Sequence, residues 1–232
     1  MNQFYAILLS GGTGSRLDSE TPKQFLKIKG KSLLQRSVLL FKVWGLAKRL
    51  TIVSHPDFIE ETELDLKELL DEGDQIVTGG KSRHESSLNA FKNIPYDESD
   101  ILIIHDVARP FVKPYELDMI CNAAIQHGLS SLAFPLHETL VLKNIEDKAE
   151  TLIKREDAML IKTPQAIHAQ RLKHLLYLDP KEEPTDLSSW GIQGGLTTKL
   201  VESNPYNIKI TRKEDLLLAE FYYEPFKNFK AQ

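Results

Sequence analysis

The sequence has 232 residues, of which 41% are hydrophobic and 27% are charged, a composition that is typical of a soluble globular protein and excludes a disordered chain. Its 29 basic and 33 acidic residues give a net charge of −4, which excludes the broad positive field that recruits nucleic acid or an anionic membrane surface. Every apolar run is shorter than the ~18 residues that a membrane span needs, and the N-terminal run is too short for a signal peptide, so we expect a cytoplasmic protein with a single domain over residues 1–232.

A glycine-rich loop near the N-terminus follows the first expected strand. The apolar residues 4–9 predict a short buried strand, and three glycines follow it at positions 11, 12 and 14. Such a loop exposes backbone N–H groups to an anion, and Arg16 and Lys23 add two positive charges nearby. Pro22 stiffens the chain just before Lys23 and limits where its ammonium group can point. These features predict a nucleoside triphosphate site.

Helical and strand patterns then alternate along the first half of the chain. Strands are expected at residues 50–53, 75–77 and 101–104, and helices at residues 33–45, 57–70 and 82–92. The continuous apolar run at 101–104 is typical of a central parallel strand that is buried on both faces. This alternation predicts an α/β fold, with a mostly parallel sheet flanked by helices.

Polar residues follow two of these strands. His105 and Asp106 come directly after the apolar run at 101–104, where side chains usually face the ligand crevice of an open α/β sheet. A carboxylate there is well placed to meet Mg²⁺, which needs only one or two carboxylates beside triphosphate oxygens. An Asp106–Arg109 pair that only ties the loop is the alternative, and the two roles are compatible. His105 alone is more typical of a structural histidine than of a ligand.

The second glycine pair, at residues 79–80, follows a strand and opens a helix that contains Ser86. Its backbone N–H groups and the Ser86 hydroxyl could face a base or a phosphate, although a simple strand turn with a helix cap fits equally well. Two matches to the end of a P-loop motif, at 30–32 and 80–82, lack the earlier glycine and are attributed to chance.

Residues 138–157 break the α/β pattern. The segments 139–143 and 151–155 flank a polar turn and predict a β-hairpin that projects from the body. A two-stranded hairpin is marginally stable in water by itself, so we expect it to pack against a partner subunit. The segment is therefore predicted to be a dimerisation arm.

The remaining patterns are those of further α/β pieces. Helices are expected at 115–127, at 169–178, after 185–186 and at 213–223, and strands at 199–201 and 207–211. In the last strand Lys209 would lie on the face opposite Ile208 and Ile210, either in solvent or toward the crevice beside Lys23. The segments 163–165 and 185–186 are expected to be polar loops that shape a substrate pocket, with helix capping as the alternative for 185–186.

Taken together, these segments resemble the 2-C-methyl-D-erythritol 4-phosphate cytidylyltransferase family of sugar-alcohol-phosphate cytidylyltransferases. The resemblance covers nearly the whole chain and rests on Gly11–Arg16, Pro22–Phe25, Gly79–Gly80 with Arg83 and Ser86, His105–Pro110, Thr163–Gln165, Thr185–Asp186 and Asn207–Thr211. It implies a Rossmann-like nucleotidyltransferase fold, a homodimer, Mg²⁺, and transfer of CMP from CTP to a polyol phosphate with release of pyrophosphate.

The resemblance also implies roles for individual residues. Arg16, Lys23 and Lys209 would neutralise the triphosphate and its transition state, and the residues that would bind CTP are Ser10, Gly11, Gly12, Gly14, Gly79, Gly80 and Ser86. The residues that would bind the acceptor are Asp106, Arg109, Thr139, Arg155, Thr163 and Thr185, with Asp106 also a candidate metal ligand and with Thr139 and Arg155 supplied by the partner's arm.

The chain departs from the family pattern at three positions. The family often has Ala where Val107 stands, Gln where Lys162 stands, and a small or acidic residue where Leu187 stands. These departures leave the nucleotide half intact and keep ribitol 5-phosphate, which would give CDP-ribitol, as an alternative acceptor to methylerythritol phosphate. A catalytically idle nucleotide-binding protein is a further alternative, and the presence of Lys23, Asp106 and Lys209 argues against it.

Overall fold

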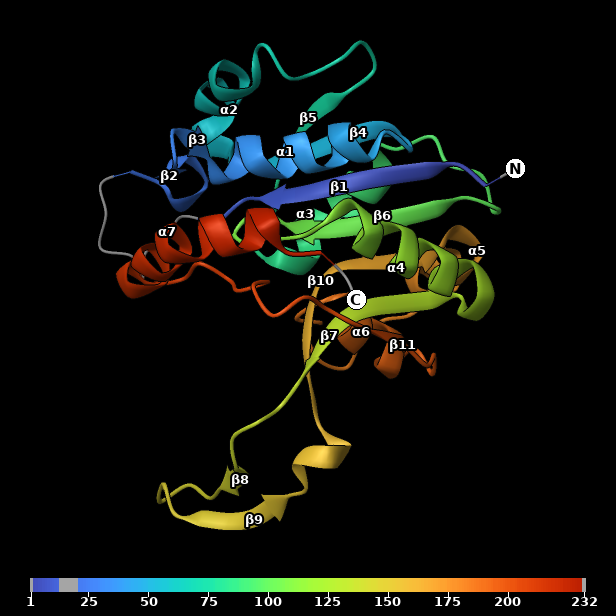
Figure 1. Ribbon diagram of the computed structural model, residues 1–232. Helices are drawn as coiled ribbons and strands as arrows, with labels where there is room; N and C mark the ends of the chain where they lie inside the picture. Colours follow the sequence, from blue (N-terminus) through green and yellow to red (C-terminus); the bar gives the residue numbers. More distant parts are fainter. Residues whose placement is uncertain (1, 13–20, 231–232) are drawn as a thin grey trace.

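A seven-stranded sheet forms the centre of the computed structural model, which describes residues 2–12 and 21–230. The strand order across the sheet is β11-β7-β10-β6-β1-β4-β5 (Figure 1). These strands are β1 (Phe4–Ser10), β4 (Ala47–Ser54), β5 (Gln75–Thr78), β6 (Ile101–Asp106), β7 (Leu129–Pro135), β10 (Met159–His168) and β11 (Lys199–Glu202). All pairings are parallel except those of β10, which runs antiparallel to both of its neighbours. The expected mostly parallel α/β sheet is confirmed.

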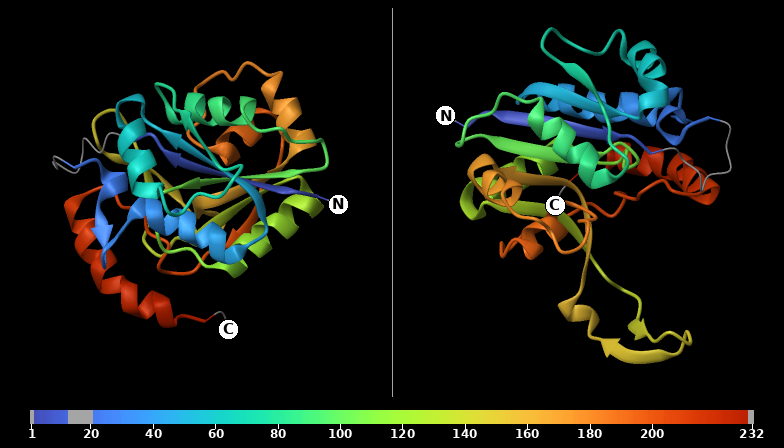
Figure 2. Two further views of the ribbon diagram at one scale, coloured as in Figure 1. Left: turned by 90° about the horizontal axis from the view of Figure 1, so that it is seen from above. Right: turned by 180° about the vertical axis from the view of Figure 1, so that it is seen from behind.

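Helices cover both faces of this sheet (Figures 1 and 2). They are α1 (Leu33–Trp44), α2 (Ile59–Leu66), α3 (Arg83–Lys92), α4 (Pro114–His127), α5 (Ala169–Leu176), α6 (Leu187–Gln193) and α7 (Lys213–Asn228). The helix expected at 57–70 ends earlier, at Leu66, and begins with a separate 3₁₀ turn at Pro56–Phe58. None of these helices has the length and apolar content needed to cross a membrane, in the part of the chain that the structure describes.

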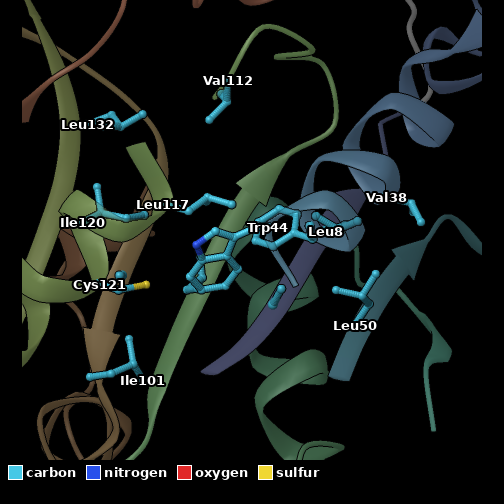
Figure 3. Packing of buried hydrophobic residues seen from close by; sticks show 14 of the residues in the cluster. Leu8, Val38, Trp44, Leu50, Ile101, Val112, Leu117, Ile120, Cys121 and Leu132 are labelled. Carbon is cyan, nitrogen blue, oxygen red and sulfur yellow. The ribbon is translucent and has the colours of Figure 1, made fainter. Parts of the chain in front are cut away.

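The two faces of β1 supply two separate hydrophobic clusters. Ala6 and Leu8 pack in one cluster with side chains of α1 and α4, among them Trp44 and Leu117 (Figure 3). The alternate residues Tyr5, Ile7 and Leu9 join the other cluster, which contains side chains of α3, α5 and α6. Since consecutive side chains of a strand point to opposite faces, β1 has to be apolar throughout. Cys121 lies buried in the first cluster, where burial raises the pKa of its thiol.

The expected hairpin is present and projects from the body (Figure 1). Its strands β8 (Leu140–Lys143) and β9 (Ala149–Ile153) pair only with each other, in an antiparallel two-stranded sheet. The second strand ends two residues before Arg155, which begins a 3₁₀ turn at Arg155–Asp157. Apolar side chains of the hairpin are exposed to solvent, with 54% of Leu142 and 68% of Leu152 accessible.

Two expectations about the second half are wrong. The segment 163–165 is not a loop but part of β10, where the pairing with β7 breaks off after Ile161 and resumes at Gln165. This irregularity accommodates Pro164, which has no N–H group to donate to a ladder. The strand expected at 207–211 is absent, since these described residues belong to no strand.

The alternation of polar and apolar residues at 207–211 reflects packing against α7 and not a position in a sheet. Ile208 and Ile210 pack against α7 in a third cluster, which includes Phe111 and Tyr222. The Ile210 N–H donates to the carbonyl of Ala108 at 2.8 Å instead of to a neighbouring strand. Residues 207–211 are therefore an extended segment that is held by the turn after β6.

Candidate functional site

A cavity of about 380 Å³ opens at the carboxyl ends of β1 and β6. The ends of β1 and β6 lie side by side because their parallel pairing sets Leu9 opposite Asp106. The end of β4 lies on the other side of β1, where Ser54 is opposite Ser10. Seven predicted site residues line the cavity: Gly11, Gly12, Lys23, Gly80, Ser86, Asp106 and Lys209. Residues separated by almost two hundred positions in the sequence therefore line the same cavity.

Asp106 is the charged centre of this cavity. Its side chain is largely buried, and Arg83 donates to Oδ1 from Nε at 3.0 Å and from Nη2 at 2.9 Å. Lys209 Nζ donates to the other carboxylate oxygen at 2.7 Å. The alternative pairing that the sequence suggested, with Arg109, is replaced by these two partners, while Arg109 Nη1 donates to the carbonyl of Asn207 at 3.4 Å.

The surroundings of Asp106 keep its carboxyl ionised. Burial alone would raise the pKa, but the charges of Arg83, Lys209 and Arg109 outweigh this effect and hold the pKa of Asp106 well below its usual range. The positive charges exceed the one carboxylate, so the mouth of the cavity favours an anionic ligand.

A chain of hydrogen bonds behind the cavity orients Asp106. Its backbone N–H donates to Thr163 Oγ1 at 3.1 Å, and Thr163 Oγ1 lies 3.2 Å from His105 Nδ1. His105 Nε2 lies 3.1 Å from the carbonyl of Arg109, so a neutral ring with its proton on Nε2 satisfies both contacts. Burial, the largest cause, and the neighbouring cations lower the pKa of His105 to about 4, although the charge of Asp106 acts in the opposite direction. Thr163 thus holds the backbone of Asp106 in place through a hydrogen bond, and His105 in turn contacts the Thr163 hydroxyl.

The side chain of Lys23 packs closely against Gly12 at the cavity. It begins a 3₁₀ turn at Lys23–Phe25, directly after Pro22. A Cβ atom at Gly12 would lie 2.7 Å from Cε and 2.9 Å from Nζ of Lys23. A larger residue at position 12 would therefore displace the ammonium group, which explains why a glycine suits this position.

The second glycine pair is packed closely against its neighbours. The Gly79 N–H donates to the carbonyl of Ser54 at 2.7 Å, and the Gly80 N–H donates to Ser86 Oγ at 3.0 Å. A Cβ atom at Gly79 would lie 3.1 Å from that same Ser54 carbonyl oxygen. Accepting from Gly80 occupies a lone pair of the Ser86 hydroxyl and leaves its proton for an acceptor on a ligand.

Other predicted site residues lie outside the cavity lining. Ser10 and Thr163 are buried, Thr185 is exposed and donates to Ser189 Oγ at 3.3 Å, and Thr139 and Arg155 are exposed on the hairpin. Arg155 Nη1 donates to the carbonyl of His137 at 3.3 Å. Gly14 and Arg16 lie outside the described residues.

Sequence reasoning gave no role to Arg83, although it makes two hydrogen bonds to Asp106. It is the first residue of α3, three positions before Ser86, and residues at this spacing share one face of a helix. That spacing was the signal that could have placed Arg83 beside the predicted nucleotide loop.

The described residues fit a dedicated metal site poorly. They contain no group of three or more His, Cys, Asp or Glu side chains arranged to hold a cation. Asp106 already accepts three hydrogen bonds from two cationic side chains. A divalent cation would therefore depend mainly on oxygens that a ligand brings with it.

Comparisons with known proteins agree on one family. A family model described as IspD, 2-C-methyl-D-erythritol 4-phosphate cytidylyltransferase, matches residues 4–225. A protein of that name from Leptospira borgpetersenii serovar Hardjo-bovis (strain JB197) is 43% identical over 228 residues, which cover 98% of this chain and 97% of the relative. Its namesake from Petrotoga mobilis (strain DSM 10674 / SJ95) is 33% identical, over 95% of this chain and 98% of the relative.

Solved structures share the fold at lower identity. The crystal structure of 4-diphosphocytidyl-2C-methyl-D-erythritol synthase from Anaerococcus prevotii DSM 20548 matches with a TM-score of 0.83 and 21% identity, over 96% of both chains. The 2-C-methyl-D-erythritol 4-phosphate cytidylyltransferase of Thermus thermophilus matches with a TM-score of 0.70 and 23% identity, over 95% of this chain and 98% of that one.

The buried neutral His105 predicts that acid destabilises the fold. Its pKa is about 4 in the folded chain and 6.5 in an exposed histidine, so below pH 6.5 the unfolded state binds a proton that the folded state does not. The free energy of unfolding should therefore fall by about 3 kcal/mol between pH 6.5 and 4. Urea denaturation of the wild type and of His105→Gln at pH 7 and pH 4.5 measures this loss.

The variant should lose much less stability than the wild type over this range, whereas His127→Gln, at an exposed position of α4, should behave like the wild type. Asp106 contributes little to this change, because a carboxylate whose pKa is lowered by folding begins to lose its stabilising contribution only as the pH falls below the unfolded-state value of 3.8. Equal pH dependence in the wild type and His105→Gln would contradict the assignment.

Proposed function

The chain belongs to the 2-C-methyl-D-erythritol 4-phosphate cytidylyltransferase family, and we propose on that basis that it transfers CMP from CTP to the phosphate of 2-C-methyl-D-erythritol 4-phosphate. Pyrophosphate is the second product, and the reaction serves isoprenoid biosynthesis by the non-mevalonate route. The proposal is supported mainly by one observation: Lys23, Lys209 and residues of the two glycine loops line the same cavity. Because CTP is a metabolic nucleotide, we assign the reaction to the cytoplasm.

The proposed chemistry is an in-line displacement at the α-phosphorus of CTP. An oxygen of the acceptor phosphate forms the new P–O bond while the bond to the β-phosphate breaks, and pyrophosphate leaves with that bond's electron pair. The acceptor phosphate is already an anion, so the protein does not have to supply a nucleophile or a strong base. Catalysis then consists of positioning and charge stabilisation.

In this proposal the cations of the cavity act on the triphosphate. Lys23 and Lys209 come from opposite ends of the chain and line the same cavity. We propose Arg16 as a third cation on the basis of the family resemblance alone. Lys209 is paired with Asp106 at 2.7 Å, which holds its ammonium group at the cavity wall. A group fixed in advance stabilises developing charge without having to reorganise during the reaction.

The glycine loops would hold the cytidine. We assign this role to Ser10, Gly11, Gly12 and Gly14 in the first loop and to Gly79 and Gly80 in the second, and Gly11, Gly12 and Gly80 line the cavity. The Ser86 hydroxyl accepts from the Gly80 N–H and can donate to an acceptor atom of the base. A divalent cation, Mg²⁺ in our proposal, would enter with the triphosphate and meet Asp106 only as an additional ligand.

The acceptor would lie beside Asp106 and Arg109, with Thr163 and Thr185 shaping its end of the pocket. Thr139 and Arg155 of the same chain flank the two strands of the projecting hairpin, and neither lines the cavity. We propose that they reach the cavity of a second subunit in a homodimer. The exposed apolar side chains of the hairpin, such as Leu142 and Leu152, support this proposal because a partner surface would bury them.

The identity of the acceptor is tested by a direct assay. Purified protein is incubated with CTP and Mg²⁺ and either 2-C-methyl-D-erythritol 4-phosphate or ribitol 5-phosphate, and pyrophosphate release is followed. We expect turnover with the first acceptor and a much lower kcat/KM with the second. Faster turnover with ribitol 5-phosphate would reassign the acceptor, and release with neither would leave a nucleotide-binding protein.

Removing either lysine of the cavity should slow the chemical step. Lys23→Ala and Lys209→Ala are each expected to lower kcat by about 10²-fold, the usual effect of losing one electrostatic donor to a transition state. Steady-state kinetics with saturating CTP measures the loss. Lys92→Ala, at an exposed position of α3, is the matched control and should retain full activity. Near wild-type kcat in both cavity variants would refute their proposed role.

The exchanged arm is tested by combining two impaired variants, assayed at an acceptor concentration well below KM. Arg155→Ala is expected to lower kcat/KM for the acceptor at least about tenfold, since it removes a charged hydrogen-bond donor. Lys209→Ala disables the cavity itself. When the two variants are co-expressed in equal amounts, half of the dimers carry one of each chain.

Each mixed dimer then has one intact site, formed by the wild-type cavity of one chain and the wild-type arm of the other. Activity should recover to about a quarter of the wild-type value per chain. The two homodimers, assayed separately, provide the baseline. Absence of recovery in mixed dimers of confirmed composition would show that each arm serves its own subunit.

A further inference from the structure

The segment that carries Lys209 lacks the support of a sheet. Residues 203–212 belong to no strand or helix, and yet Lys209 Nζ reaches Asp106 Oδ2 at 2.7 Å. A long lysine side chain loses considerable rotational freedom when it is held in one place, so its backbone has to be held as well. The contacts of residue 207 show how this is achieved.

Asn207 is fully buried two positions before Lys209, and both its side-chain Nδ2 and its backbone carbonyl make hydrogen bonds. Its Nδ2 donates to the carbonyl of Thr163 at 3.1 Å and to Ser203 Oγ at 3.0 Å. Its carbonyl oxygen accepts from Lys162 Nζ at 2.6 Å and from Arg109 Nη1 at 3.4 Å. Two cations thus meet on one backbone oxygen, and the contact with Lys162 is the shorter one.

We propose that Lys162 is a positioning residue of the cytidylyltransferase reaction, which fixes the backbone at Asn207 and thereby sets Lys209 against the CTP phosphates. The inference rests on the proposed function for its kinetic consequences, while the positioning itself is a property of the fold. Lys162 belongs to β10 and precedes Thr163. The Thr163 hydroxyl orients Asp106 by accepting a hydrogen bond from the backbone N–H of Asp106. One strand therefore aligns both members of the Asp106–Lys209 pair.

The surroundings of Lys162 make this contact sensitive to pH. Burial, the largest cause, and the charge of Arg109 lower the pKa of its ammonium group to about 8, although Glu116 acts in the opposite direction. The ring of Phe134, from β7, lies 4.9 Å from the ammonium nitrogen. The carboxylate of Glu116 is already occupied, since it accepts from Asn204 Nδ2 at 2.6 Å and from Ser203 Oγ at 3.1 Å.

Loss of the Lys162 proton would weaken the bond to Asn207, because an uncharged amine is a poorer donor than an ammonium group. Lys209 would then be less well fixed at alkaline pH. A glutamine at position 162 lacks both the charge and the length to replace this contact.

The test compares kcat and its pH profile in the wild type, Lys162→Gln and Lys162→Arg, with CTP and the acceptor saturating. We expect kcat of the wild type to fall above about pH 8, and Lys162→Gln to be about tenfold slower at pH 7 without this fall. Lys162→Arg, which keeps a charged donor, should retain most of the activity at pH 7 and extend it to higher pH. A wild-type kcat and profile in Lys162→Gln would overturn the proposal.

A second measurement asks whether Lys162 acts through Lys209. In the Lys209→Ala background, Lys162→Gln should have little further effect on kcat, because its target is already missing. Independent, multiplicative effects of the two substitutions would overturn the proposal. Lys199→Gln, at an exposed position of β11, is the matched control in both backgrounds.

Hydrogen exchange separates this inference from the proposed activity. The Ile210 N–H, which donates to the carbonyl of Ala108 at 2.8 Å, should exchange faster in Lys162→Gln than in the wild type, while the amides of β4 stay unchanged. This result would support the positioning role even in a protein without transferase activity. Unchanged exchange over residues 207–211 in a folded Lys162→Gln variant would overturn it.

Discussion

The site depends on one buried carboxylate and the cations that compensate it. Asp106 stands at the end of β6 and accepts from Arg83 at the start of α3 and from Lys209 in the segment before α7. Burying an unpaired carboxylate would be costly, so the fold needs both of these side chains, and the proposed chemistry uses Lys209 as well. The pairing joins three distant segments and leaves an excess of positive charge for an anionic ligand.

The strand β10 connects this charged centre to the rest of the protein. It is the one antiparallel strand of the seven-stranded sheet in the described chain, and it returns from the projecting hairpin to lie between β6 and β7. Thr163 on this strand supports Asp106, and Lys162 beside it holds Asn207. A 3₁₀ turn at Arg155–Asp157 joins the hairpin to β10, so the residues behind the site follow the hairpin closely in the chain.

The hairpin and the body differ in how they are stabilised. The body buries two apolar clusters on the two faces of the sheet, and this burial is its main source of stability. The hairpin exposes its apolar side chains and is held by its own ladder of hydrogen bonds and by polar contacts at its turn, such as the hydrogen bonds that Asn144 Oδ1 accepts from the N–H groups of Glu146 and Lys148. Under the proposed function, the association of two subunits would complete both the stability of the hairpin and the acceptor end of the site.

The sequence by itself determined the α/β class, the glycine pairs after β1 and β5, the hairpin and the place of Asp106 at the end of a buried strand, because each depends on a local pattern of apolar, glycine or charged residues. The tertiary structure alone decided that Lys209 faces Asp106, because residues 207–211 are held by the turn after β6 and not by a ladder whose register could be read. It also revealed Arg83 as a partner of Asp106 and placed Thr163 within β10, where Pro164 made a strand hard to predict. These contacts join positions far apart in the chain, so no local pattern contains them.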